Sequence, residues 1–252
     1  MNVSPAKPLN CGMEQLGIFD HIYALLLGVV APLLAIKAGH TSLAGISFDT
    51  RTKIALYRGN SLLLWALATI ATIIWWFSGR PMANMGFQWP QIDDWRVPAL
   101  WAGVFSMLYA VDVWRKTATA EARAATRAHW LVHAPFLPAT LREFAHYCLL
   151  ALTAACAEEI AFRGYLISYL LLLLGNHPET TVLILLLNAL IFGLVHWYQG
   201  REAVIKIVVM SLSFGGLLLS TQSLLFAVLL HLAIDLAGGL ISMRILSVNS
   251  EL

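Results

Sequence analysis

The chain has 252 residues, a formal net charge of +2, 59% hydrophobic residues and only 12% charged residues. Soluble domains carry about 25% charged residues, so a chain with half that share cannot cover a globular surface with solvated side chains. Soluble classes are therefore excluded, and so is disorder, because the chain is too apolar to stay unfolded in water. The balanced charge, without a basic stripe, also indicates no nucleic-acid partner.

Seven apolar runs approach the ~20 helical residues that are needed to cross a hydrocarbon core of ~30 Å. They predict an all-α, polytopic membrane helix bundle of about seven transmembrane helices, folded as a single domain over residues 1–252. The fourth run is too long for one straight span, so it should tilt or its end should turn back into the interface. The predicted spans are Phe19–Ile36, Leu62–Ser78, Pro98–Trp114, Phe144–Leu174, Thr181–Tyr198, Ala203–Ser220 and Leu224–Arg244.

Loop cations set the predicted orientation, because cytoplasmic loops are enriched in Lys and Arg. Cations follow the first, third and fifth spans and end the seventh, whereas the other side holds only Lys7, Arg80 and Arg96. The alternation predicts a multi-pass protein of the inner (plasma) membrane, with the N-terminus outside and the C-terminus cytoplasmic. The stretch Ala118–Arg142 is predicted as an amphipathic helix on the cytoplasmic surface, bound to anionic lipid rather than to substrate. The loop after the first span should hold Lys37, Arg51, Lys53 and Arg58.

The second half of the chain carries polar and ionisable side chains inside its apolar runs. A charged group at the bilayer centre costs at least ~2.5–3.5 kcal/mol, so these side chains should converge inside the bundle instead of facing lipid. They come from the fourth, fifth and seventh predicted spans. They are Glu158, Glu159, Arg163, Asn188, His196, His231 and Asp235.

Helical spacing gives the two glutamates different roles. Glu159 and Arg163 lie at i and i+4 with the acid on the N-terminal side, which is the favourable order for an internal ion pair. Glu158 lies about 140° from Arg163 around the helix, so it remains an unneutralised carboxylate in an apolar setting. We expect Glu158 to act as a general base and Glu159 and Arg163 to form a structural clamp that holds it.

The histidines are placed by the same spacing. His231 and Asp235 share a face, and two interpretations stay open: Asp235 orients the imidazole, or both side chains donate to a reacting carbonyl. Asn188, Phe192 and His196 form a row at four-residue intervals, in which Phe192 is a packing wall under the site. One histidine in a membrane helix is often a helix–helix hydrogen bond, but the joint pattern on three helices favours function.

Several rival chemistries lack their motifs. The chain contains no H-E-x-x-H and no G-x-S-x-G sequence, which argues against the usual zinc-protease helix and against a serine nucleophile. Glu158, His196 and His231 could still form a known zinc ligand set, but a site without metal or another cofactor is favoured. What remains is a carboxylate that activates water for attack on an amide or ester carbonyl, with donors that stabilise the oxyanion.

Three short motifs follow one another in this region. They are E-E-x-x-x-R at Glu158–Arg163, F-x-x-x-H at Phe192–His196 and H-x-x-x-D at His231–Asp235. Their order and spacing resemble the E-E-x-x-x-R, F-x-x-x-H and H-x-x-x-N/D motifs of the CAAX prenyl endopeptidase and bacteriocin-processing (CPBP) family of intramembrane glutamic proteases. The catalytic core is then predicted to cover about 144–244, in the fourth to seventh spans.

The resemblance implies a helical fold with a conical cavity, in which Glu158 and His196 activate water and His231 and Asp235 form the oxyanion hole. Prenyl endopeptidases carry asparagine at the last position, and its amide can donate a hydrogen bond, whereas Asp235 donates only when it is protonated. The implied function is a metal-independent endopeptidase that cleaves a membrane-anchored protein or peptide close to the bilayer. Its role would be CAAX-type processing, or protein maturation, sorting or immunity.

Two other functions are kept beside this one. A non-catalytic membrane immunity or scaffold protein of the same fold would need none of the chemistry, and the intact pair of Glu158 and His196 argues against it. A proton-coupled transporter also uses buried Glu and His side chains. The absence of inverted repeats with broken helices in matching halves of the sequence counts against transport.

Overall fold

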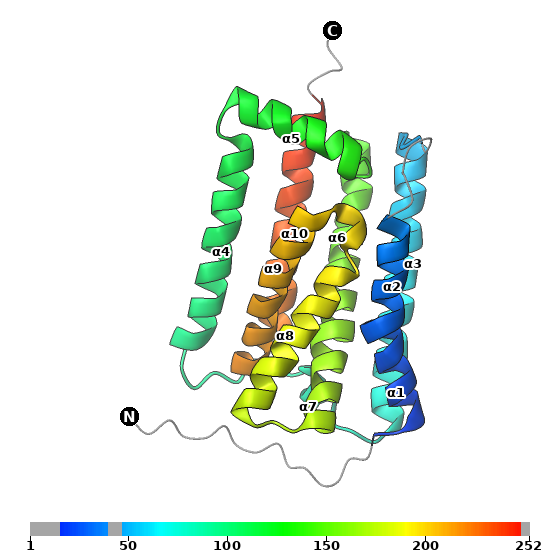
Figure 1. Ribbon diagram of the computed structural model, residues 1–252, viewed down its shortest axis with the longest axis vertical. Helices are drawn as coiled ribbons and strands as arrows, with labels where there is room; N and C mark the ends of the chain where they lie inside the picture. The colour runs from blue at the N-terminus through cyan, green and yellow to red at the C-terminus, as the bar shows by residue number, and fades with distance from the viewer. Residues whose placement is uncertain (1–15, 40–46, 248–252) are drawn as a thin grey trace.

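The computed structural model describes residues 16–39 and 47–247, and the regular elements of these residues are all helical. Most helices run side by side along the long axis, with α4 at one edge, α1 to α3 at the other, and α5 across one end (Figure 1). The elements are α1 (Ile18–Leu25), the π-helix η1 (Leu26–Val30), α2 (Ala31–Gly39), α3 (Thr50–Phe77), the 3-10 helix η2 (Met82–Met85), α4 (Arg96–Thr117), α5 (Ala120–His133), α6 (Leu141–Glu158), the π-helix η3 (Glu159–Ile167), α7 (Ser168–Leu174), α8 (Pro178–Leu194), the 3-10 helix η4 (Trp197–Gln199), α9 (Arg201–Thr221) and α10 (Leu225–Leu246).

The predicted class, a helix bundle with several membrane-crossing helices, is confirmed. Within the described residues, five helical segments are long and apolar enough to span a bilayer, and α8 is a shorter apolar helix. The five segments are Ile18–Ala38, Thr50–Phe77, Arg96–Thr117, Arg201–Thr221 and Leu225–Leu246. The remaining predicted span corresponds to the continuous helix that α6, η3 and α7 build together.

That continuous helix runs from Leu141 to Leu174 without a reversal of the chain. The expectation that its end could turn back into the interface is therefore wrong. At about 1.5 Å per residue its length is roughly 50 Å, which exceeds a ~30 Å hydrocarbon core, so the helix must tilt or project from the bilayer. Its middle, η3, is a π-helix, a rare form that occurs frequently at functional sites.

The first loop is shorter than the sequence predicts, because α3 begins at Thr50 instead of Leu62. Asp49 caps this helix by accepting a hydrogen bond from the Thr52 backbone amide at 2.7 Å. Lys53 is buried at 6% exposure and donates to Glu143 Oε2 at 3.1 Å. Cations that were predicted for a loop thus lie in the first turns of α3, and one of them joins α3 to α6.

The polar stretch after the third span forms a helix as predicted, although only over Ala120–His133. The linker that follows is fixed to the bundle from two sides. Tyr57 donates to the Phe136 carbonyl at 2.5 Å, and Ser242 donates to the Pro138 carbonyl at 3.0 Å. The linker therefore sets where α6 enters the bundle, and α6 ends at Glu158, directly before Glu159 begins η3.

The fifth predicted span is too long at its C-terminal end. Helix α8 ends at Leu194, and a turn containing η4 leads into α9. Tyr198 of this turn packs against Phe136, in the linker that follows α5, with ring centres 6.1 Å apart, so the turn lies near the α5 end of the bundle. His196 therefore lies in a turn and is not part of an uninterrupted helix.

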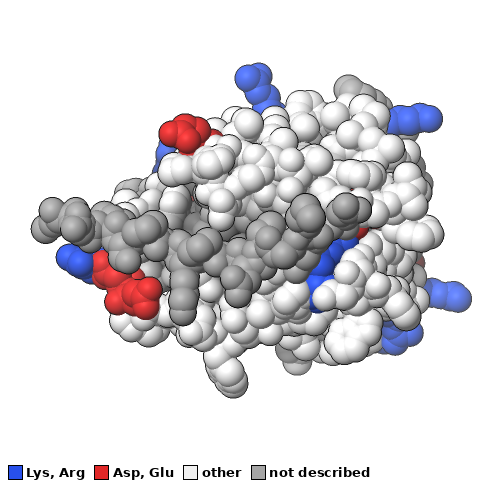
Figure 2. Space-filling model, turned by 90° about the horizontal axis from the view of Figure 1, so that it is seen from below, with Lys and Arg blue, Asp and Glu red and all other residues white. Residues whose placement is uncertain are grey.

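The end opposite α5 is closed by the loop between α3 and α4, which includes η2. Leu224 donates its amide to the Gly86 carbonyl at 3.1 Å, and Ser223 donates to the Gln88 carbonyl at 2.7 Å. Gly86 has a φ of 81°, and an added Cβ would lie 2.8 Å from Leu218 Cδ1, so only glycine fits there. Seen from this end, most of the visible described surface is uncharged (Figure 2).

Candidate active site

The structure brings residues of the first and third motifs together around one imidazole ring. His231 Nδ1 lies 2.8 Å from Glu159 Oε1, and His231 Nε2 lies 3.9 Å from Glu158 Oε2 and 3.7 Å from Asp235 Oδ2. The ring is 4% exposed. Helices that are far apart in the sequence therefore place three carboxyl groups around one histidine, near the middle of the α6–η3–α7 helix.

The predicted ion pair of Glu159 and Arg163 is confirmed. Arg163 Nη1 lies 3.1 Å from Glu159 Oε1, and both side chains are fully buried. The guanidinium carbon lies 4.0 Å from the centre of the Phe192 ring, within the range of a cation–π contact. Phe192, which the sequence predicts as a packing residue, also packs against Phe162 and His196.

Glu159, and not Asp235, makes the hydrogen bond that fixes the His231 ring. A deprotonated carboxylate can only accept, so at 2.8 Å the His231 Nδ1 carries the hydrogen and donates it to Glu159. The Asp235 oxygen, at 3.7 Å from His231 Nε2, is beyond hydrogen-bond range. The ring is therefore held through Nδ1, and its Nε2 faces the other two carboxyl groups.

Exposure separates the two glutamates. The side chains of Glu159 and Arg163 are sealed, whereas those of Glu158 and Asp235 keep 13% and 28% of their surface exposed. A carboxylate that faces lipid at this depth would be costly. Of the three carboxyl groups around His231, those of Glu158 and Asp235 are therefore the ones that are not sealed.

His196 lies beside this cluster and makes no hydrogen bond to it in the described part of the chain. Its Nδ1 is 2.8 Å from the Phe192 carbonyl oxygen, which can only accept. Nδ1 therefore carries a hydrogen, and in the neutral ring Nε2 keeps its lone pair. The ring packs on Phe192 at a centroid distance of 4.7 Å and is only half-buried.

Asn188 connects α8 to η3 through a buried hydrogen bond. Its Nδ2 donates to the Phe162 carbonyl at 2.8 Å, and the residue is 1% exposed. This bond joins α8 to η3 one residue before Arg163. The position agrees with the predicted supporting place of Asn188 in the row with Phe192.

A second buried network is not predicted by the sequence patterns. Tyr165 of η3 donates to Asp20 Oδ1 at 2.8 Å, and Arg80 donates to Asp20 Oδ2 at 2.5 Å. Asp20 is 1% exposed, and the Arg80 guanidinium lies 4.3 Å from the Trp75 ring centre. The one signal in the sequence is an acid inside the first apolar run, but its partners lie 60 and 145 residues away in the chain.

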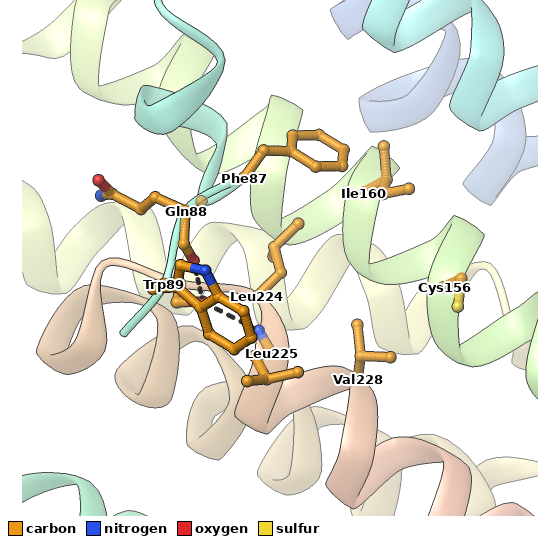
Figure 3. A pocket seen from close by; sticks show the side chains of 10 residues that line it. Phe87, Gln88, Trp89, Cys156, Ile160, Leu224, Leu225 and Val228 are labelled. Atoms are coloured by element: carbon orange, nitrogen blue, oxygen red, sulfur yellow. Dashed lines mark hydrogen bonds between the residues drawn. The ribbon is translucent and has the colours of Figure 1, made fainter. Parts of the chain in front are cut away.

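A cavity of about 520 Å³ lies away from these residues, towards the end opposite α5. Its walls are largely apolar and come from the loop at Gly86–Trp89, from Cys156 and Ile160, and from the start of α10 (Figure 3). None of the predicted catalytic side chains lines it. Among the described residues, no three His, Cys, Asp or Glu side chains are grouped so that they could hold a metal ion.

Comparison with known families gives one match. Residues 140–237 match the model of a family described as type II CAAX prenyl endopeptidase Rce1-like. The matched segment begins just before α6 and ends within α10, so it contains all three motifs. No curated protein and no solved structure matches the chain.

Proposed function

Because residues 140–237 match the model of the Rce1-like family of type II CAAX prenyl endopeptidases, a peptidase family, we propose that this membrane protein is a glutamic intramembrane endopeptidase. Glu158 is its general base and activates the water that attacks the peptide carbonyl. The observation that carries the proposal is the contrast between the paired, sealed Glu159 and the partly exposed Glu158. No ion pair joins Glu158 to a lysine or arginine in residues 16–39 and 47–247.

The proposed reaction begins with a water molecule between Glu158 and His196. Glu158 takes a proton from the water, whose oxygen forms a bond to the carbonyl carbon, and the carbonyl electron pair moves onto its oxygen. When the tetrahedral species collapses, the C–N bond breaks and Glu158 returns the proton to the departing nitrogen. His196 Nε2, which has a free lone pair in the neutral ring, accepts the second hydrogen bond of the water and orients it.

His231 is suited to stabilise the oxyanion. Its Nδ1 hydrogen is committed to Glu159, so a second proton on Nε2 makes it a charged donor that is fixed in place. The three surrounding carboxyl groups favour that charge. A preorganised donor of this kind contributes about 2.7–4 kcal/mol to the stabilisation of a transition state.

The substrate class, the extent of the catalytic core and the orientation in the membrane are part of the same proposal. The substrate is a membrane-anchored protein or peptide, and the catalytic core covers about 144–244 of a single domain, 1–252. Arg115, Lys116, Arg123 and Arg127 lie on α4 and α5 at the α5 end, which we assign to the cytoplasm. The N-terminus then lies outside and the C-terminus inside the inner membrane.

The proposal predicts protein termini that depend on Glu158. Membrane proteins from cells that express the wild-type chain should contain new termini, and these should be absent from cells with Glu158→Ala. Mass spectrometry of the labelled termini measures this and names the substrate. Identical sets of termini, with unchanged function of the Glu158→Ala chain, would instead favour the non-catalytic immunity or scaffold protein.

Asp235→Asn separates the two roles that the sequence left open for this residue. Because Glu159 already orients His231, we expect the asparagine variant to keep at least about a tenth of wild-type turnover, and Asp235→Leu to lose considerably more. Turnover of the substrate that the terminus comparison identifies would be measured for both variants. Equal, severe losses in both would show that the negative charge of Asp235 is needed and that it acts on His231.

A further inference from the structure

Behind the candidate active site lies a sealed group of polar atoms that make no hydrogen bond to the protein. The donors are the Nε and Nη2 atoms of Arg163, and its Nη1, although ion-paired with Glu159 Oε1 at 3.1 Å, also makes no well-directed hydrogen bond. Glu159 Oε2 and Asn188 Oδ1 are acceptors, and the Ser211 hydroxyl can both donate and accept. All four residues are at most 1% exposed. Buried polar groups nearly always have a hydrogen-bond partner. Several buried polar atoms without one in the same region therefore indicate a partner that is not part of the protein chain.

The four residues lie on three elements that pack against one another, η3, α8 and α9. The Arg163 guanidinium lies between two rings, at 4.0 Å from Phe192 of α8 and at 5.5 Å from Phe214 of α9. Asn188 stands one helical turn before Phe192, and Ser211 stands about one turn before Phe214. The unpartnered acceptors are therefore on the same two helices that flank the guanidinium, a turn of about 5.4 Å away.

The mixture of groups identifies the ligand class. The guanidinium can only donate, and the Glu159 and Asn188 oxygens can only accept. An anion would be repelled by those oxygens, and a cation would be repelled by the arginine. Water both donates and accepts, and a buried water typically makes about three hydrogen bonds to polar groups that would otherwise have no partner.

We propose that the space between Arg163, Asn188 and Ser211 binds one or more structural water molecules, which bridge η3, α8 and α9. The waters complete the solvation of the arginine at membrane depth without opening it to bulk solvent. They also hold Glu159 Oε2, so that Glu159 Oε1 stays directed at His231. These waters take no part in the proposed proton transfers, so the site should also be present in a chain that is inactive because Glu158 is replaced.

Radiolytic labelling tests the proposal on the unmodified protein in lipid nanodiscs. Hydroxyl radicals formed from a bound water oxidise the side chains next to it, even when these are closed to bulk solvent. We expect Phe192 and Phe214 to be labelled at least about fivefold faster than Phe105, which is also buried and has its ring centre 5.4 Å from that of Phe214. Equal labelling of the three rings would overturn the proposal. The same pattern is expected in Glu158→Gln, whatever its activity.

The sign of a stability change gives a second test. If a water bonds Ser211 Oγ, Ser211→Ala breaks that bond and lowers the Tm by several degrees. If the hydroxyl has no partner, removing a desolvated polar group leaves the Tm unchanged or raises it, and that result would contradict the site. Ser213→Ala is the matched control, because Ser213 is equally buried on the same helix and bonds only to the Val209 carbonyl, at 3.4 Å.

Discussion

Glu158→Gln is expected to abolish cleavage of the peptide bond while the abundance and the Tm of the inserted protein stay close to wild type. Glutamine has nearly the same size and shape, but its amide cannot take the proton of the attacking water. General-base catalysis alone contributes about 10²–10⁴-fold, so we expect turnover to fall by at least about a hundredfold. The measurement is turnover of the identified substrate in purified form, together with thermal unfolding of each variant.

Glu159→Gln is the matched control on the neighbouring residue. It removes the partner of Arg163 and the charged acceptor of His231, both of which are buried. We expect the Tm to fall together with activity, in contrast to the loss of activity alone in Glu158→Gln. Near-normal turnover by Glu158→Gln would show that this carboxylate is not the base.

Arg163→Ala is expected to lower the amount of folded protein strongly. The substitution leaves Glu159 as a buried charge without its partner and removes the contact with the Phe192 ring. Breaking a buried pair in this way costs about 3–5 kcal/mol, which is a large share of a total stability of about 5–15 kcal/mol. The folded fraction would be measured by size-exclusion chromatography of a fluorescent fusion after extraction from the membrane.

Arg96→Ala serves as the control for loss of a salt bridge as such. Arg96 pairs with Asp94, but its side chain is 87% exposed, and surface pairs contribute little to stability. We expect no measurable change in the folded fraction of this variant. An Arg163→Ala chain that folds as well as Arg96→Ala would show that the buried pair is not the structural clamp.

The site is predictable from the sequence to the extent that its members lie on helices with regular spacing. His231 and Asp235 are four residues apart on α10, and they share a face as expected. Charges in apolar runs are also informative, because lipid exposure is so costly that they must converge. That argument alone predicts that Glu158, Glu159 and His231 meet inside the bundle.

Other features depend on contacts that no local pattern encodes. Glu159 binds His231 across 72 residues, and single-helix geometry offers only Asp235 as its partner. Helix α8 ends before His196 because the chain turns there into α9. This turn is apolar, so the sequence pattern does not distinguish it from a continuation of the helix. The early start of α3 likewise depends on the pairing of Lys53 with Glu143, which lies 90 residues away.

The π-helical form of η3 is a constraint in its own right. Glu159 at its start is tied to His231, and Tyr165 near its end is tied to Asp20. Tightening this stretch to the ordinary α form, which turns about 100° at each residue, would rotate Tyr165 relative to Glu159, because the wider π form turns less at each residue. The helix could then satisfy one anchor or the other but not both, so the two ties together hold this stretch in the rarer form.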